Sequence, residues 1–233
     1  MNPVLRSSAA HLFVSSLEAP EPEPADGHHL FRVLRLRDGE VVTVSDGAGR
    51  WLPTVVKGGG LDAAGDITAE DAPVPCEVVT AIPKGDRLEW MVQKLTEVGA
   101  TRIVLANFAR SVVRWDASRA ARQIERLHRV VREAASQSRR VWLPALEGPL
   151  PVTDVLATAG SVLLDPAGAA GVIAHRVVVG PEGGCTAEEV AMAPATATLG
   201  QTILRVETAA IVAASRVVVE APLAAANSSQ RVK

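Results

Sequence analysis

Two glycine-containing loops hold the residues whose types and spacing could bind a ligand. The first lies in residues 177–189, VVVGPEGGCTAEE, where a short apolar run stops at Gly180. Thr186 and Glu189 then have the spacing of a capping box, which predicts a helix that begins just after Cys185. A strand that passes through glycines into a helix exposes backbone N–H groups at the carboxyl edge of a sheet, where open α/β sheets bind ligands.

The residues of this loop favour a neutral or cationic ligand over a phosphate. Pro181 removes one N–H donor, and Glu182 repels anions. The spacing also differs from the two glycine-rich phosphate-binding motifs, since there is neither a Gly-Lys-Ser/Thr nor a G-x-G-x-x-G. A tight strand-to-helix turn with no ligand is the alternative, and both interpretations stay open on the residues alone.

A second loop of the same kind occupies residues 198–210, TLGQTILRVETAA, and ends a short strand at Gly200. Arg205 and Glu207 follow it, and two such loops in one sheet indicate a composite pocket. Arg205 could instead form a structural salt bridge with Glu207 or Glu182.

The elements that must position these loops read as alternating strands and helices from residue 77 onward. Short apolar runs predict strands, and apolar residues at helical spacing predict helices. This alternation predicts a mostly parallel sheet with helices on both faces. The predicted strands are 77–82, 101–106, 161–165, 175–180 and 196–200, and the predicted helices are 84–100, 115–140, 186–193 and 205–221.

Residues 1–72 show a different pattern, with short strands separated by turn residues. Two Asp-Gly pairs, at residues 38–39 and 46–47, have the spacing of hairpin turns and predict a small antiparallel β-barrel or sheet. Within it, residues 31–37 are predicted to form a strand that presents Arg32, Arg35 and Arg37 on one face. We therefore predict two domains, residues 1–72 and residues 73–233.

Composition and charge narrow the class of protein. With 48% hydrophobic and 21% charged residues, the 233-residue chain is typical of a globular protein. Cys76 and Cys185 are far apart and lack His partners at ligand spacing, so we expect no metal site, no disulfide framework and a cytoplasmic location. The net charge is −2, yet residues 84–142 contain thirteen Lys/Arg and six Asp/Glu. That segment is either a basic face for a phosphate-rich partner or a solvated helix with internal salt bridges.

Together the two loops resemble the paired signature of the SPOUT methyltransferases, and more narrowly of the RsmE family, which methylates N3 of a uridine in 16S ribosomal RNA. Segments KGDRLEWMVQKLTEVGATRIV, REAASQSRR and HLFRVLRLRDGEVVTVSDGAG resemble the family as well, so the resemblance extends from about residue 11 to residue 219. It implies an α/β domain with a C-terminal trefoil knot, a preceding PUA-like β-barrel, the cofactor S-adenosylmethionine (SAM) and a homodimer. Ser136 departs from the family, which has an acid at that position.

The resemblance also implies roles for individual residues. Arg205 would hold an RNA phosphate or the uracil anion, and Glu207 would act as a base or orient Arg205. RNA contacts are expected from Arg32, Arg35, Arg37, Gln137, Arg139 and Arg140. The residues expected to bind SAM are Gly180, Glu182, Gly183, Gly184, Leu199, Gly200, Ile203, Leu204 and Thr208.

The expected reaction is SAM-dependent methylation of a uridine N3 in 16S rRNA, on the assembled 30S subunit. Two alternatives remain at this point. One is a SPOUT methyltransferase with a different RNA target, and the other is a ribosome assembly factor that keeps the fold without catalysis.

Overall fold

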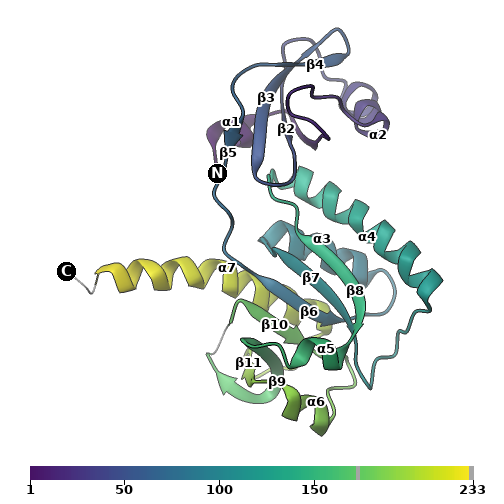
Figure 1. The fold of residues 1–233 in the computed structure, drawn as a ribbon, viewed down its shortest axis with the longest axis vertical. Helices are drawn as coiled ribbons and strands as arrows, with labels where there is room; N and C mark the ends of the chain where they lie inside the picture. Colours follow the sequence, from purple (N-terminus) through teal and green to yellow (C-terminus); the bar gives the residue numbers. More distant parts are fainter. Residues whose placement is uncertain (172–173, 231–233) are drawn as a thin grey trace. The chain divides into compact units, whose positions relative to one another are not determined.

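The computed structural model describes residues 1–171 and 174–230, which divide into two compact units (Figure 1). Unit 1 contains Met1–Pro73 and Arg132–Leu143, and unit 2 contains Val74–Val131 and the chain from Pro144 onward. The domain boundary that we predict near residue 72 therefore leaves out a second segment of unit 1. Among the described residues, no helix is long and apolar enough to cross a membrane.

Unit 1 is built on a five-stranded sheet with the order β1-β2-β3-β4, in which β5 also pairs with β3. Its strands are β1 (Ala10–Phe13), β2 (Val41–Ser45), β3 (Arg50–Lys57), β4 (Gly60–Ala63) and β5 (Thr68–Ala69). The predicted turn at Asp46-Gly47 joins β2 and β3 into an antiparallel hairpin, with Gly47 at a φ of 76°. The sequence predicts an antiparallel sheet, but the β1–β2 pair is parallel, so the sheet is mixed. The core of this unit includes Leu12, Leu17, Leu30, Val42, Val44, Leu52 and Val56.

The predicted strand over residues 31–37 is wrong, because the chain there is helical and then irregular. Helix α2 (Pro24–His28) runs directly into the π-helical turn η1 (His29–Val33), after the short helix α1 (Pro3–Ser7) at the start of the chain. Pro24 starts α2 at a position where proline is favoured, and the turn buries Leu30 completely in the core. Arg35 has a φ of 55°, which no regular strand allows.

Arg132–Leu143 belongs to unit 1 because its backbone and side chains bond to the sheet there. The Nε2 of His11 lies 3.0 Å from the Arg140 carbonyl, and Ser45 donates to the carbonyl of Val141 at 3.1 Å. Arg132 donates to the carbonyl of Phe13 at 2.6 Å. No local pattern in the sequence signals such contacts, since they join segments about a hundred residues apart.

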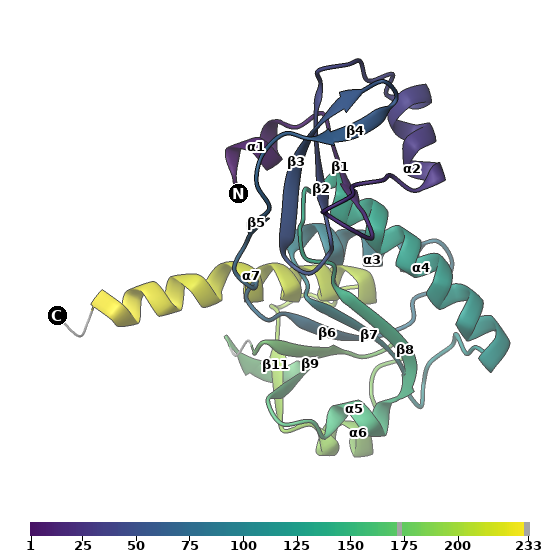
Figure 2. The same ribbon diagram turned by 45° about the horizontal axis from the view of Figure 1, so that its top comes forward.

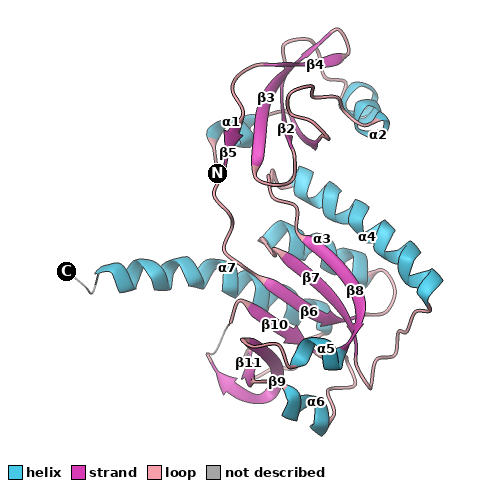
Figure 3. Cartoon of the chain, in the orientation of Figure 1, coloured by secondary structure: helices cyan, strands magenta, loops and turns pink. Residues whose placement is uncertain are grey.

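Unit 2 contains a six-stranded sheet with the order β11-β9-β10-β6-β7-β8, and every neighbouring pair is parallel, as predicted (Figures 2 and 3). Its strands are β6 (Glu77–Ala81), β7 (Arg102–Asn107), β8 (Ala145–Pro151), β9 (Ser161–Ala170), β10 (Arg176–Val179) and β11 (Ala195–Thr198). Its helices are α3 (Arg87–Val98), α4 (Ala117–Gln137, which continues into unit 1), α5 (Val152–Leu156), α6 (Ala187–Met192) and α7 (Val206–Gln230).

Helices cover both faces of this sheet. Alternate strand residues such as Val79, Val104 and Val178 form one core cluster with α5 and with partly buried residues of α6. On the other face, α7 packs against α3 and against strands β6 and β10. The central strands are consequently apolar on both sides, as buried parallel strands are.

The sequence does not predict β8 or α5. Strand β8 contains Pro149 and Pro151, which usually argue against a strand because proline lacks an N–H. Here β8 is the last strand at one edge of the sheet, where a missing donor costs little.

Candidate active site

A cavity of about 350 Å³ lies in unit 2, where strands β9, β10 and β11 meet their following loops. The loop after β10 forms one wall, and the loop after β11 together with the start of α7 forms another. This is the carboxyl edge of a parallel sheet, the usual place for a ligand in an open α/β fold. The cavity is large enough for a small organic ligand.

Seven of the nine predicted cofactor residues line this cavity. They are Gly180, Glu182, Gly183, Gly184, Leu199, Ile203 and Leu204. Gly200 and Thr208 are not part of the lining, and Thr208 is exposed in the first turns of α7. Residues that our sequence analysis missed also contribute, among them Asp165 and Pro166 of β9.

The predicted capping box holds the first loop in place. Helix α6 begins after Thr186, whose hydroxyl accepts from the backbone N–H of Glu189 at 3.2 Å, as predicted. The buried Glu189 carboxylate accepts from the N–H of Thr186 at 2.8 Å and from that of Ala109 at 2.7 Å. One side chain therefore ends the loop and ties it to the segment after β7.

Two glycines of this loop have a clear physical requirement. A Cβ atom at Gly180 would lie 2.5 Å from the sulfur of Cys185, so only glycine fits without a shift. Gly184 has a φ of 71°, which side chains rarely adopt. Substitution at either position would change the wall of the cavity.

Two arginines from outside the loop anchor it. Arg110 donates to the carbonyls of Gly183 and Cys185 at 3.2 and 3.3 Å. Arg87, at the start of α3, bonds to the carboxylate of Glu182 at 2.6 Å. Both carry positive charge, yet neither is among the residues that line the cavity.

Arg87 also connects this loop to α7. The same nitrogen lies 3.5 Å from Oε1 of Glu207, which is only 5% exposed. Oε2 of Glu207 has no hydrogen-bond partner among the described residues. Arg205 is exposed and has no carboxylate partner in the described chain. The salt bridges to Glu182 and Glu207 that the sequence allows for Arg205 are formed by Arg87 instead. The signal for Arg87 is its position just after β6, whose carboxyl end lies at the same edge of the sheet.

The cavity wall contains a thiol that stays protonated. Burial, together with the nearby carboxylates of Glu189 and Asp165, raises the pKa of Cys185 to about 12. The thiol is therefore a neutral, weakly polar part of the wall at physiological pH.

The matches to known proteins agree with this site. A family model described as an RNA methyltransferase domain matches residues 70–218, and an RNA methyltransferase PUA domain matches residues 22–60. The ribosomal RNA small subunit methyltransferase E of Mycobacterium bovis is 36% identical, over 81% of each chain. The chain belongs to the ribosomal RNA small subunit methyltransferase E family. This confirms the predicted family, the RNA methyltransferase class and the PUA-like N-terminal domain.

Solved structures also superpose on this chain. The ribosomal RNA small subunit methyltransferase E of Neisseria gonorrhoeae, bound to SAM, is 27% identical with a TM-score of 0.72 and covers 89% of this chain and 96% of its own. A structure from Legionella pneumophila with bound SAM is 26% identical with a TM-score of 0.77 and the same coverage. These matches confirm the SPOUT-type α/β fold and SAM as the cofactor found in the family. The trefoil knot stays a prediction.

The residues predicted to contact RNA lie in unit 1, and some have exposed side chains whereas others already form hydrogen bonds within the unit. Arg32, Arg35, Arg37 and Gln137 are exposed. The guanidinium of Arg139 donates to the carbonyls of Ser8, Ala9 and Ser136. Burial lowers the pKa of Arg139. Arg140 accepts from His11 through its backbone carbonyl. Arg139 therefore stabilises the packing of unit 1.

Among the described residues, no group of three or more His, Cys, Asp or Glu side chains is placed to hold a metal ion.

Proposed function

We propose that this protein transfers the methyl group of SAM to N3 of a uridine in 16S rRNA. The observation that carries the proposal is the cavity that the two glycine loops form at the carboxyl edge of the sheet. We further propose that the substrate is the assembled 30S subunit and that the enzyme acts as a cytoplasmic homodimer, which rests on the family resemblance. The acidic balance of residues 1–72, with eleven Asp/Glu and six Lys/Arg, also favours a structured ribonucleoprotein over bare RNA.

The residues of the cavity fit SAM. Its lining contains the carboxylates Asp165 and Glu182 and no Lys, Arg or His, which suits a sulfonium cation. Leu164, Leu199 and Leu204 provide apolar surface for an adenine ring, and the exposed Gly183 and Gly184 bring the backbone to the cavity wall. When bound, SAM supplies an electrophilic methyl group on a positively charged sulfur.

The chain's contribution to the reaction is to hold the uracil and stabilise its N3 anion. Arg205 is exposed directly before α7, between Leu204 and Val206, which both line the cavity. Its guanidinium and the positive end of the α7 dipole both favour negative charge at this mouth. We infer that Arg205 binds the uracil anion or the phosphate beside it, and that alignment of N3 with the methyl carbon provides much of the acceleration.

The contacts of Glu207 favour a positioning role. Its carboxylate is buried, faces Arg87 at 3.5 Å and is not part of the cavity wall. Through Arg87 it reaches Glu182, so the three side chains connect the start of α7 to the first glycine loop. A role of Glu207 as general base would require its carboxylate to reach N3 directly or through one water.

A methyl-transfer assay tests the function. Purified protein and tritiated SAM are incubated with 30S subunits from a strain that lacks the enzyme, or with free 16S rRNA, and the labelled nucleoside is identified by chromatography. We expect 3-methyluridine from the subunits, a loss of at least about 100-fold in rate for Arg205→Ala, and unchanged SAM binding for that variant.

Other outcomes would exclude parts of the proposal. A labelled nucleoside other than 3-methyluridine would refute the target, and labelling of free RNA only would refute the 30S substrate. SAM binding without transfer to either substrate would favour a non-catalytic assembly factor. A monomeric mass for the purified protein in analytical ultracentrifugation would refute the homodimer.

A further inference from the structure

A stripe of exposed arginines runs along α4 and is not explained by the site described above. It consists of Arg119, Arg122, Arg126 and Arg129, which we call the α4 stripe. At 3.6 residues per turn these four side chains fall within an arc of about 80°, on the side of the helix away from the buried Leu127 and Val131. All four lie in the part of α4 that belongs to unit 2.

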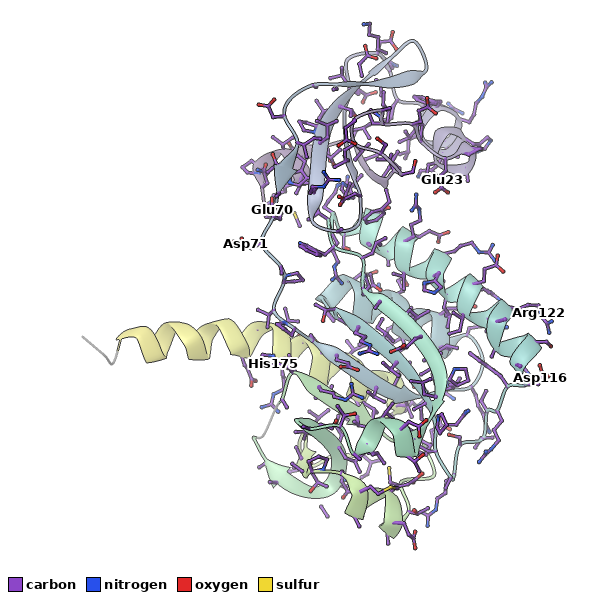
Figure 4. All side chains as sticks on the ribbon, in the orientation of Figure 1. Glu23, Glu70, Asp71, Asp116, Arg122 and His175 are labelled. Carbon is purple, nitrogen blue, oxygen red and sulfur yellow. The ribbon has the colours of Figure 1, made fainter. Side chains whose placement is uncertain are left out.

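The charge of the stripe is largely uncompensated. Residues 109–131 contain six arginines, no lysine and only two acids, in a chain whose net charge is −2. Arg126 pairs with Glu89 of α3 at 2.8 Å, whereas Arg119, Arg122 and Arg129 have no carboxylate within salt-bridge distance among the described residues. The first acid, Asp116, uses its carboxylate to accept from the backbone of Arg119 and the hydroxyl of Ser118. Figure 4 shows Arg122 and Asp116 at this end of α4.

We propose that the α4 stripe binds the sugar-phosphate backbone of the RNA substrate, which rests on the proposed function. From Arg119 to Arg129 the helix rises about 15 Å, which is long enough to follow a short stretch of one RNA strand. Planar guanidinium groups match phosphate oxygens in a bidentate way, and every cation of this segment is an arginine. The interaction positions the RNA without reading its sequence.

An acidic protein surface fits the stripe less well. Stable protein interfaces have an apolar centre, and they need exposed aromatic or aliphatic side chains between the charges. None of the exposed large hydrophobic residues of the described chain lies in α4. The residues between the arginines include Ala121 and Glu125, both exposed, and Glu133 ends the charged face four residues after Arg129.

The test compares three variants that carry three substitutions each. R119Q/R122Q/R129Q removes the unpaired charges, and R119K/R122K/R129K keeps the charge but loses the fork geometry. The control K94Q/R102Q/R216Q removes three charges from the same unit that already pair with carboxylates, so its net charge equals that of the Gln variant. Arg and Gln have similar helix propensities, so α4 should fold in all three.

Affinity for 30S subunits from a strain that lacks the enzyme, and for fluorescently labelled 16S rRNA transcribed in vitro, is measured between 50 and 300 mM salt. Each lost phosphate contact should lower the salt slope by about 0.7, which for three contacts corresponds to about 100-fold weaker binding at 0.1 M salt. We expect the full loss of about 100-fold in RNA affinity and the lower salt slope for the Gln variant, and a smaller loss of affinity for the Lys variant. The control variant should bind RNA like the wild type, and all three variants should bind SAM with unchanged affinity.

Three results would overturn the proposal. The first is a Gln variant that binds RNA as tightly as the wild type with the same salt slope. The second is a Gln variant that binds free RNA normally but loses 30S subunits, which would assign the stripe to a ribosomal protein. The third is a wild-type protein that binds SAM but neither binds nor methylates 30S subunits or free 16S rRNA. That result would remove the proposed function together with the stripe, whereas the first two leave that function intact.

Discussion

The buried His11 of unit 1 should make the stability of that unit depend on pH. The side chain is 2% exposed, and its Nδ1 and Nε2 lie 2.9 Å from the Thr43 hydroxyl and 3.0 Å from the Arg140 carbonyl. A carbonyl only accepts, so Nε2 carries the proton and Nδ1 accepts from Thr43. Burial lowers the pKa of His11 from 6.5 to about 4, with a further lowering from the charge of Arg139 and an opposing effect of the Arg140 carbonyl.

The size and sign of the effect follow from that difference in pKa. Between pH 6.5 and pH 4 the unfolded chain binds a proton at His11 that the folded chain does not, so acidification favours unfolding. The contribution of neutral His11 is fully present above pH 6.5, and about 3 kcal/mol of stability is lost as the pH falls to 4. Below pH 4 both states are protonated and His11 adds no further loss.

Urea unfolding followed by NMR at amides of strand β2, at pH values from 4 to 7.5, measures this dependence in unit 1. His11→Gln keeps one hydrogen-bonding amide but cannot titrate, so its free energy of unfolding should fall by about 3 kcal/mol less than that of the wild type over this range. The exposed His29 provides a matched control, because His29→Gln should follow the wild type. Parallel curves for wild type and His11→Gln, or a His11 imidazole whose pKa in the folded protein lies near the ordinary value of 6.5, would refute the reasoning.

Three further predictions concern unit 2. Gly99 ends α3 with a φ of 109°, so Gly99→Ala should lower the free energy of unfolding by about 1–2 kcal/mol, and an unchanged thermal midpoint would contradict this. Because its pKa is raised to about 12, Cys185 should react with iodoacetamide about 1000-fold more slowly than a normal thiol at pH 7.5, as mass spectrometry would show. Arg87→Gln releases Glu182 from its anchor and should weaken SAM binding by about 10-fold in calorimetry, whereas Arg102→Gln should bind SAM normally.

The sequence predicts best those features whose cause lies within a few residues. Helix α3 has its apolar face and its terminal Gly99 in one short segment, and the capping box of α6 spans only four residues. The glycine loop after β10 is recognisable for the same reason, since close approach of the backbone restricts Gly180 and Gly184 directly. These local signals were sufficient to place most of the cavity wall.

Structural features that depend on residues far away in the sequence could not be predicted from local patterns. The segment 31–37 alternates well enough to resemble a strand, but burial of Leu30 in the core of unit 1 fixes residues 29–33 as a helical turn, after which the chain is irregular. Arg139 looks like a free cation in the sequence, yet its guanidinium donates to the carbonyls of Ser8 and Ala9, about 130 residues away. A local pattern carries no information about such partners.

The same distinction separates the roles of the two arginines near the cavity. Both Arg87 and Arg205 lie close to an acid in the sequence, and spacing alone pairs Arg205 with Glu207. In the fold Arg87 pairs with the carboxylates of both Glu182 and Glu207, so its single positive charge is shared between two acids at the carboxyl edge of the sheet. Because Arg87 already pairs with both acids, the exposed guanidinium of Arg205 has no carboxylate partner among the described residues and is available to an anion. The ion pairs of Arg87, in which only the Glu207 carboxylate is buried, are therefore a condition for the role that we propose for Arg205.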